Sequence, residues 1–122
     1  MTRINLVPPS ELHRKHLVAE FREIVRVFAL ARKAQHDMHK REQPSEYTLG
    51  KGHVIFWYDK LKFISDRYDQ LCNEMHNRGY TCNRIPKQEL EQGIGKHMFF
   101  GYNPTAKAIA ENRQRIQDRY PK

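Results

Sequence analysis

The stretch Glu11–Lys33, ELHRKHLVAEFREIVRVFALARK, decides the fold. Apolar residues recur in it at steps of three and four, at Leu17, Phe21, Ile24, Phe28 and Ala31. In a helix with 3.6 residues per turn, this spacing places them on one stripe that must face a core. We therefore predict a helix over residues 11–33 that packs through this stripe.

Two more helices are predicted further along the chain. Residues 54–77 carry apolar side chains at helical spacing, and Gly79 stands where a glycine would end such a helix. Asn103 and Pro104 fit the start of a third helix, which runs to about residue 119. The stripe of the second helix consists of Trp57, Leu61, Ile64, Tyr68, Leu71 and Met75.

The segments between these helices are predicted to be loops. Residues 35–45 are polar and charged, and residues 80–101 contain Pro86 and several glycines with little periodicity. We expect an all-α fold, a single compact domain of three helices with long connecting loops and almost no strand. A chain of 122 residues is long enough to bury its own core.

The composition is strongly basic. Lys and Arg number 22 against 14 acidic residues, which gives a formal net charge of +8 and a pI near 9.7. Such a balance is typical of proteins that bind nucleic acid, and it would also suit an anionic membrane. No run of about 18 apolar residues and no signal-peptide pattern is present. We expect an intracellular monomer, cytoplasmic or nucleoid-associated, that binds DNA and not a membrane.

Cysteines and histidines do not predict a metal site. Cys72 and Cys82 lack the CxxC spacing of zinc sites, so we expect reduced, partly buried thiols. Histidines three residues apart occur at positions 13 and 16 and at positions 36 and 39, but no carboxylate or cysteine completes a ligand set. Surface histidines are the expected interpretation.

Charged residues flank the apolar stripe of the first helix. Arg22 and Arg26 are one turn apart, roughly 6 Å along the axis. Like charges at this spacing repel by a few tenths of a kcal/mol, so the pair favours an anionic partner such as neighbouring phosphates. Glu23 lies between the two arginines and needs a separate explanation.

The N-terminus offers that explanation. If Met1 is removed, the chain begins with the free α-amine of Thr2, whose ordinary pKa of about 7.7–8.0 leaves roughly a tenth of it neutral near pH 7. An amine that attacks C1′ of a deoxyribose displaces the base and leaves an imine. A carboxylate beside the imine stabilises it, and Glu23 would be that carboxylate. The extended connector Val7-Pro8-Pro9 is long enough to bring Thr2 back to Glu23.

Two blocks of sequence form a recognisable pattern. The first block contains Thr2-Arg3-Ile4-Asn5-Leu6, Ser10-Glu11-Leu12, His16-Leu17, Ala19-Glu20, Arg22-Glu23 and Arg26-Val27-Phe28. The second contains Leu49-Gly50-Lys51-Gly52-His53-Val54, Phe56, Tyr58-Asp59-Lys60-Leu61 and Phe63. Together they closely resemble the pyrimidine-dimer-specific DNA glycosylase/AP lyases, the phage endonuclease V-like family, and the resemblance is specific over roughly the first 65 residues.

The resemblance implies a function and a set of site residues. The enzyme would cleave the glycosidic bond of the 5′ pyrimidine in UV-induced cyclobutane dimers of double-stranded DNA, then cut the backbone by β-elimination. It would flip a base out of the duplex and need no cofactor or metal, and it would bind undamaged DNA electrostatically. The implied roles are Thr2 as nucleophile, Glu23 as catalytic carboxylate, Arg3, Arg22 and Arg26 around the lesion and its phosphates, and His16 nearby.

The chain departs from the family in two places. Members often carry Leu-Pro after the catalytic glutamate, whereas this chain has Ile24-Val25. A proline would kink the helix there, so the placement of Arg26 relative to Glu23 is open. The type member also has an aromatic tail that helps to engage the lesion, and this chain has Arg119-Tyr120-Pro121-Lys122 instead.

Two other functions stay open at this point. One is an amine-dependent glycosylase for another lesion, such as a ring-opened purine. The other is a non-catalytic DNA-binding helical module in which Glu23 merely pairs with Arg26.

Overall fold

The structure is a computed structural model that describes residues 3–120. Helices and loops account for these residues, apart from one isolated antiparallel bridge between Lys60 and Phe99. The all-α class is therefore confirmed. The helices are α1 (Arg14–Glu23), α2 (Val25–Ala34), α3 (His53–Phe56), α4 (Leu61–Asn77), α5 (Lys87–Glu91) and α6 (Ala106–Asp118), with short 3-10 turns at Pro9–Glu11, Met38–Lys40 and Lys96–Met98.

The predicted number of three helices is not exact, because the first predicted helix is divided. It begins at Arg14, where the His13 side chain accepts a bond from the Lys15 amide, and it is interrupted at Ile24. There the Val27 amide bonds to the Ile24 carbonyl, three residues back instead of four. Two β-branched residues, Ile24 and Val25, meet at this point, and such residues have lower helix propensity.

The other boundaries also shift. The predicted helix over 54–77 is divided into α3 and α4, although it ends at Gly79 as expected, with φ +79° and the Tyr80 amide bonded to the Met75 carbonyl. α5 lies inside the segment predicted to be a loop. α6 is capped by Thr105, whose hydroxyl accepts the Ala108 amide, and not by Asn103.

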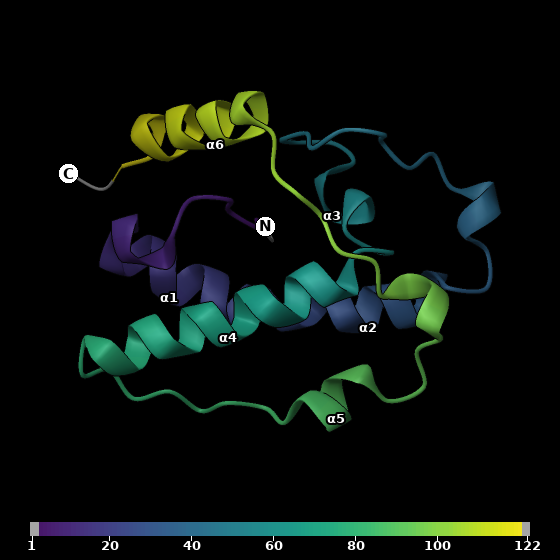
Figure 1. Cartoon of the computed structure of the whole chain (residues 1–122), viewed down its shortest axis with the longest axis horizontal. Helices are drawn as coiled ribbons and strands as arrows, with labels where there is room; N and C mark the ends of the chain where they lie inside the picture. The colour runs from purple at the N-terminus through teal and green to yellow at the C-terminus, as the bar shows by residue number, and fades with distance from the viewer. Residues whose placement is uncertain (1–2, 121–122) are drawn as a thin grey trace.

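α4 runs through the middle of the molecule with α1 and α2 packed against it (Figure 1). α6 lies above these helices, and the N-terminal segment passes between α6 and α1 (Figure 1). The predicted stripes are buried, with Leu17, Ile24 and Leu61 fully inaccessible. Within residues 3–120, no helix combines the length and the apolar character needed to cross a bilayer.

A buried polar network joins the N-terminal segment to three helices. Glu20 of α1 and Arg67 of α4 form a two-pronged ion pair, with Nε–Oε2 and NH2–Oε1 distances of 2.7 and 3.0 Å. Their side chains are only 1% and 3% exposed. Asn5 donates to Glu20 Oε1 at 2.8 Å and accepts from Asn112 of α6 at 2.8 Å. Every charged member of the network is thus paired.

The backbone of residues 4–7 is held by side chains of distant elements. Asn112 Oδ1 accepts the Leu6 amide at 2.7 Å, and Arg67 NH1 donates to the Val7 carbonyl at 2.6 Å. Both backbone groups of Ile4 are also held. The Ile4 amide donates to His53 Nε2 at 2.8 Å, and its carbonyl accepts from the Tyr47 hydroxyl at 3.0 Å. A segment without regular secondary structure therefore has a fixed path.

His53 must be neutral to hold this segment. Its Nδ1–H donates to the Thr48 carbonyl at 2.7 Å, so Nε2 is free to accept the Ile4 amide. Burial lowers the pKa of His53 below its ordinary value. Protonation would place a second N–H against the Ile4 N–H and break the contact.

Loss of the Glu20 charge should strongly destabilise the fold. We expect Glu20→Gln to lower the free energy of unfolding by about 3–5 kcal/mol, because Arg67 would remain buried without a counter-charge. Glu11→Gln is the matched control, since Glu11 pairs with Arg113 at an exposed site and should cost at most about 1 kcal/mol. Urea denaturation measures both. Equal losses in the two variants would contradict the role of the network.

Acidification should weaken the hold on the N-terminal segment. Below pH about 6.5, His53 is protonated in the unfolded chain but stays neutral in the folded chain, because its folded pKa is lower. The unfolded state then binds more protons, so the free energy of unfolding falls as the pH falls towards the folded pKa. Above pH about 6.5, His53 should not contribute to the pH dependence of stability. Comparing unfolding free energies at pH 7.5 and 5.5, we expect a smaller difference for His53→Gln than for wild type. The exposed-site control His39→Gln should keep the wild-type difference.

Candidate active site

A cleft of about 270 Å³ opens between α1, the N-terminal segment and α6. Three of the predicted site residues, Arg3, His16 and Glu23, line it together. The predicted nucleophile, Thr2, lies outside the described residues. The cleft is lined by Arg3, Asn5, His16, Ala19, Glu20, Glu23, Ile116 and Arg119.

Glu23 is the last residue of α1 and lies where the helix is interrupted. Its side chain is 26% exposed, and its Oε2 lies 2.9 Å from NH1 of Arg26, which is 62% exposed. Arg26 therefore reaches Glu23 although no proline follows the glutamate. An ion pair this exposed contributes at most about 1 kcal/mol, so a phosphate can compete for Arg26.

Arginines make the cleft electropositive. Burial, followed by repulsion from Arg115 and Arg119 of the α6 region, lowers the pKa of Arg3, which nevertheless stays protonated at physiological pH. Within residues 3–120, none of these three arginines forms a salt bridge. Three positive charges gathered without a carboxylate partner favour an anionic ligand.

His16 forms part of the wall towards the end of α6. Its Nε2–H donates to the Arg119 carbonyl at 3.1 Å. The other ring nitrogen, Nδ1, is buried and has no hydrogen-bond partner in the described part of the chain. The ring also lies near His13 and Tyr120, with centroid distances of 6.4 and 6.3 Å.

Arg22 is not brought to this cleft. It lines a second cavity, of about 290 Å³, on another side of α1. The wall of this cavity includes the stacked rings of Phe21 and Tyr68, whose centroids are 5.5 Å apart. It is lined by Val18, Phe21, Arg22, Val25, Tyr68, Met75, Thr81, Asn83 and Ile85. Because Arg22 and Val25 flank Glu23 in the chain, the two hollows meet α1 near the same point.

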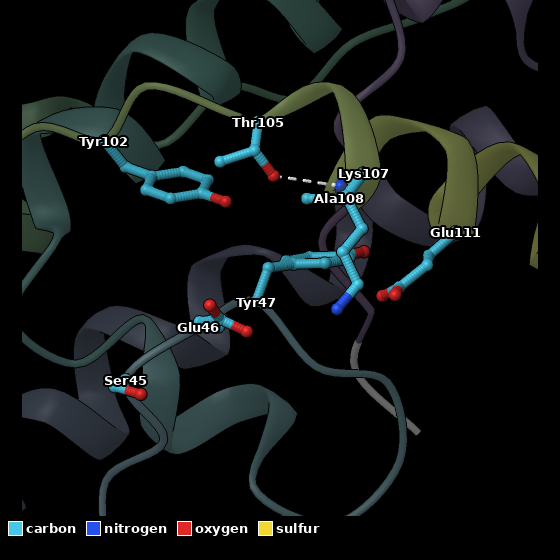
Figure 2. Close-up of a pocket in the computed structure, with 8 residues that line it drawn as sticks. All are labelled: Ser45, Glu46, Tyr47, Tyr102, Thr105, Lys107, Ala108 and Glu111. Carbon is cyan, nitrogen blue, oxygen red and sulfur yellow. Dashed lines mark hydrogen bonds between the residues drawn. The ribbon is translucent and has the colours of Figure 1, made fainter.

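Figure 2 shows a further pocket, of about 260 Å³, between the loop before α3 and the start of α6. It carries two carboxylates, Glu46 and Glu111, against one lysine, Lys107, and is therefore less suited to a phosphate than the arginine-lined cleft. Tyr47 forms part of its wall while holding the Ile4 carbonyl, and burial raises the pKa of Tyr47. The lining residues are Ser45, Glu46, Tyr47, Tyr102, Thr105, Lys107, Ala108 and Glu111.

Sequence reasoning did not assign Arg115 and Arg119 to the site. The sequence shows them only as members of a basic helix, with no pattern that separates them from Lys107 or Arg113. Asn5 and Glu20 belong to the block that resembles the glycosylase family, yet their connection to Arg67 spans 47 residues and more and has no local signature.

The cleft thus brings together a carboxylate, arginines and the N-terminal segment. The sequence also matches a known family. The family model described as pyrimidine dimer DNA glycosylase matches residues 1–88, which is more than half of the chain and includes Arg3, His16 and Glu23. The chain belongs to the pyrimidine dimer DNA glycosylase family, and it is a DNA repair enzyme.

Proposed function

We propose that this enzyme cleaves the glycosidic bond of the 5′ pyrimidine in a cyclobutane dimer and then cuts the strand through an imine on the Thr2 amine. The observation that carries the proposal is the cleft that Glu23 lines together with Arg3 and Arg119, neither of which forms a salt bridge within residues 3–120. We also propose that it works as a monomer on double-stranded DNA inside the cell.

The proposed reaction begins at C1′ of the damaged nucleotide. The neutral Thr2 amine forms a bond to C1′ while the bond to the pyrimidine breaks, and the amine gives a proton to the departing pyrimidine. The sugar opens as the C1′–O4′ bond breaks and O4′ takes up a proton from solvent, which leaves a protonated imine. Glu23 stabilises this cation and takes a proton from C2′. The electrons of the C2′–H bond then expel the 3′ phosphate, and water later releases the amine. The imine itself is the electron sink.

The anchored backbone supports Thr2 as the nucleophile. Residues 4–7 are held by bonds to His53, Tyr47, Asn112 and Arg67, so Arg3 has little freedom to leave the cleft. Residue 2 is covalently adjacent to Arg3, and one residue spans at most about 3.6 Å. A fixed attachment reduces the entropy lost when the amine meets C1′.

The arginines would hold the phosphates that flank the lesion. Arg3 and Arg119 line the cleft, and Arg26 is free to exchange Glu23 for a phosphate because its ion pair is exposed. Such an exchange would also release Glu23 for its catalytic role at the moment when DNA binds. Arg22, on the other side of α1, would contact the strand at a second point.

We infer a place for the extrahelical base in the Arg22 cavity. A base that leaves the duplex needs an apolar and aromatic surface to replace its stacking. The cavity supplies Phe21, Tyr68 and Met75 within reach of the same helix that carries Glu23. The extrahelical base would be the one opposite the dimer, so that this base and the attacked sugar of the dimer occupy opposite sides of α1.

Borohydride trapping tests the nucleophile and the substrate together. We expect a covalent adduct at Thr2 on a duplex with one cis-syn thymine dimer and on an abasic duplex, but none on undamaged DNA. If adducts formed only on a duplex carrying a ring-opened purine, the preferred lesion would be that purine and not the dimer. No adduct on any duplex would overturn the mechanism.

The Glu23→Gln variant tests the catalytic carboxylate. We expect its excision rate to fall about 100-fold or more while its DNA binding is retained, and the control Glu11→Gln should keep the wild-type rate.

Salt dependence tests the arginines. Each phosphate contact contributes about 0.9 to the slope of log K against log salt concentration. We expect Arg3→Ala and Arg119→Ala each to reduce that slope by roughly this amount. Arg41→Ala removes the same charge from the end of the Met38–Lys40 turn, outside the cleft, where Arg41 pairs with Asp37, and should leave the slope nearly unchanged. An equal reduction in all three variants would mean that only net charge matters.

A further inference from the structure

Two sulfur atoms meet at one side of α4. Cys72 lies on this helix, and Cys82 lies in the segment 80–86 that follows it. Their Sγ atoms are 2.6 Å apart, about half an ångström more than the length of an S–S bond of about 2.05 Å. Both residues are half-buried thiols in the structure.

The backbone of segment 80–86 is already directed along α4. After the reversal at Gly79, the Ile85 amide donates to the Tyr68 hydroxyl at 2.9 Å. Arg84 forms an ion pair with Asp69 of α4 and lies over the Tyr68 ring. The turn at Gly79 precedes Cys82 in the chain and these contacts follow it, so the sulfurs meet without a rearrangement of the helix.

We propose that Cys72 and Cys82 are a site of reversible disulfide formation that fixes segment 80–86 to α4. The co-reactant is a low-molecular-weight disulfide of the glutathione class. The thiolate of one cysteine attacks it and releases one thiol, and the other cysteine then displaces the second thiol to form the intramolecular S–S bond. Two protein thiols are oxidised, one small disulfide is reduced to two thiols, and no other reactant is needed.

The bond would act on the wall of the Arg22 cavity. Thr81, Asn83 and Ile85 line that cavity and lie in the same short segment as Cys82. In the reduced protein this wall is held by the Tyr68 and Asp69 contacts, which are polar and partly exposed. A covalent link at residue 82 would restrict the backbone motion of its two neighbours, Thr81 and Asn83. The disulfide itself does not depend on the proposed function, whereas its effect on a flipped base does.

The surroundings make the exchange slow at neutral pH. Burial, together with the neighbouring Cys72 thiol, raises the pKa of Cys82 to about 11. Cys82 therefore holds its proton near pH 7, and exchange should accelerate as the pH rises. Slow exchange is expected for a disulfide that forms under sustained oxidation, and it differs from the fast exchange of the cysteine pairs in redox catalysts.

Glutathione redox buffers test the site cleanly, because the chain has only two cysteines. The full-length protein is equilibrated with reduced and oxidised glutathione in varied ratio and alkylated with maleimide, and its intact mass is measured. We expect both thiols to disappear together in monomeric protein, with a single midpoint and without bound glutathione. Tryptic digestion, which cuts at Arg78, should then yield two peptides joined through residues 72 and 82. Persistent alkylation of both thiols, glutathione adducts or intermolecular dimers would overturn the proposal.

Thermal unfolding and amide exchange test whether the bond fixes the segment. We expect the oxidised protein to unfold at a temperature about 5 °C or more above the reduced protein, with slower amide exchange over residues 80–86. Cys72→Ser and Cys82→Ser are the matched controls, and oxidising buffer should not raise either unfolding temperature. A disulfide that forms without changing exchange in 80–86 would overturn its role in fixing the wall. Neither readout uses damaged DNA, so a failure of the proposed glycosylase mechanism would be seen separately.

Discussion

The buried ion pair between Glu20 and Arg67 is the constraint on which the rest of the structure depends. Its two charges are almost inaccessible, and each is satisfied by several bonds, which is the condition for a buried pair to be tolerated. Apolar residues of similar size would often be as stable or more so. The pair nevertheless has a consequence that an apolar contact lacks, because its directional bonds extend to Asn5 and the Val7 carbonyl and so set the position of the N-terminal segment.

This constraint reaches the site through the backbone. The Leu6 and Val7 amides donate hydrogen bonds to Asn112. The Ile4 backbone is bonded to His53 and Tyr47. These bonds position Arg3 in the cleft that Glu23 also lines. The arrangement gathers like charges, because Arg3 and Arg119 line the cleft and both Arg115 and Arg119 repel Arg3. Under the proposed function, a bound phosphate would relieve this repulsion and so gain part of its binding free energy.

The interruption at Ile24 sets the position of Glu23 at the end of α1. A proline would break the helix by removing an amide, and in this chain a three-residue hydrogen bond at Val27 produces a milder break at the same place. Ile24 keeps right-handed helical torsion angles of −60° and −32°, so α2 continues from α1 without a loop. Glu23 is consequently the last residue of a helix and lies beside Arg26, with one hollow on either side of α1.

The sequence alone predicted the helical class and the apolar stripes, and its resemblance to a family motif implied a site shared by Arg3, His16 and Glu23, because helical periodicity and the order of residues in a motif are local properties. It also indicated the end of α4 at Gly79, where only a residue without a Cβ adopts the required positive φ easily. The sequence did not predict the number of helices, because the breaks at Ile24 and before Leu61 depend on a balance between weak helix propensities and packing. Tertiary packing placed Arg115 and Arg119 beside Arg3, from segments far apart in the chain, and no local pattern records that contact. Packing also directed Arg22 into a different cavity. The meeting of Cys72 and Cys82 spans only ten residues, but it requires the chain to turn back along α4 after Gly79.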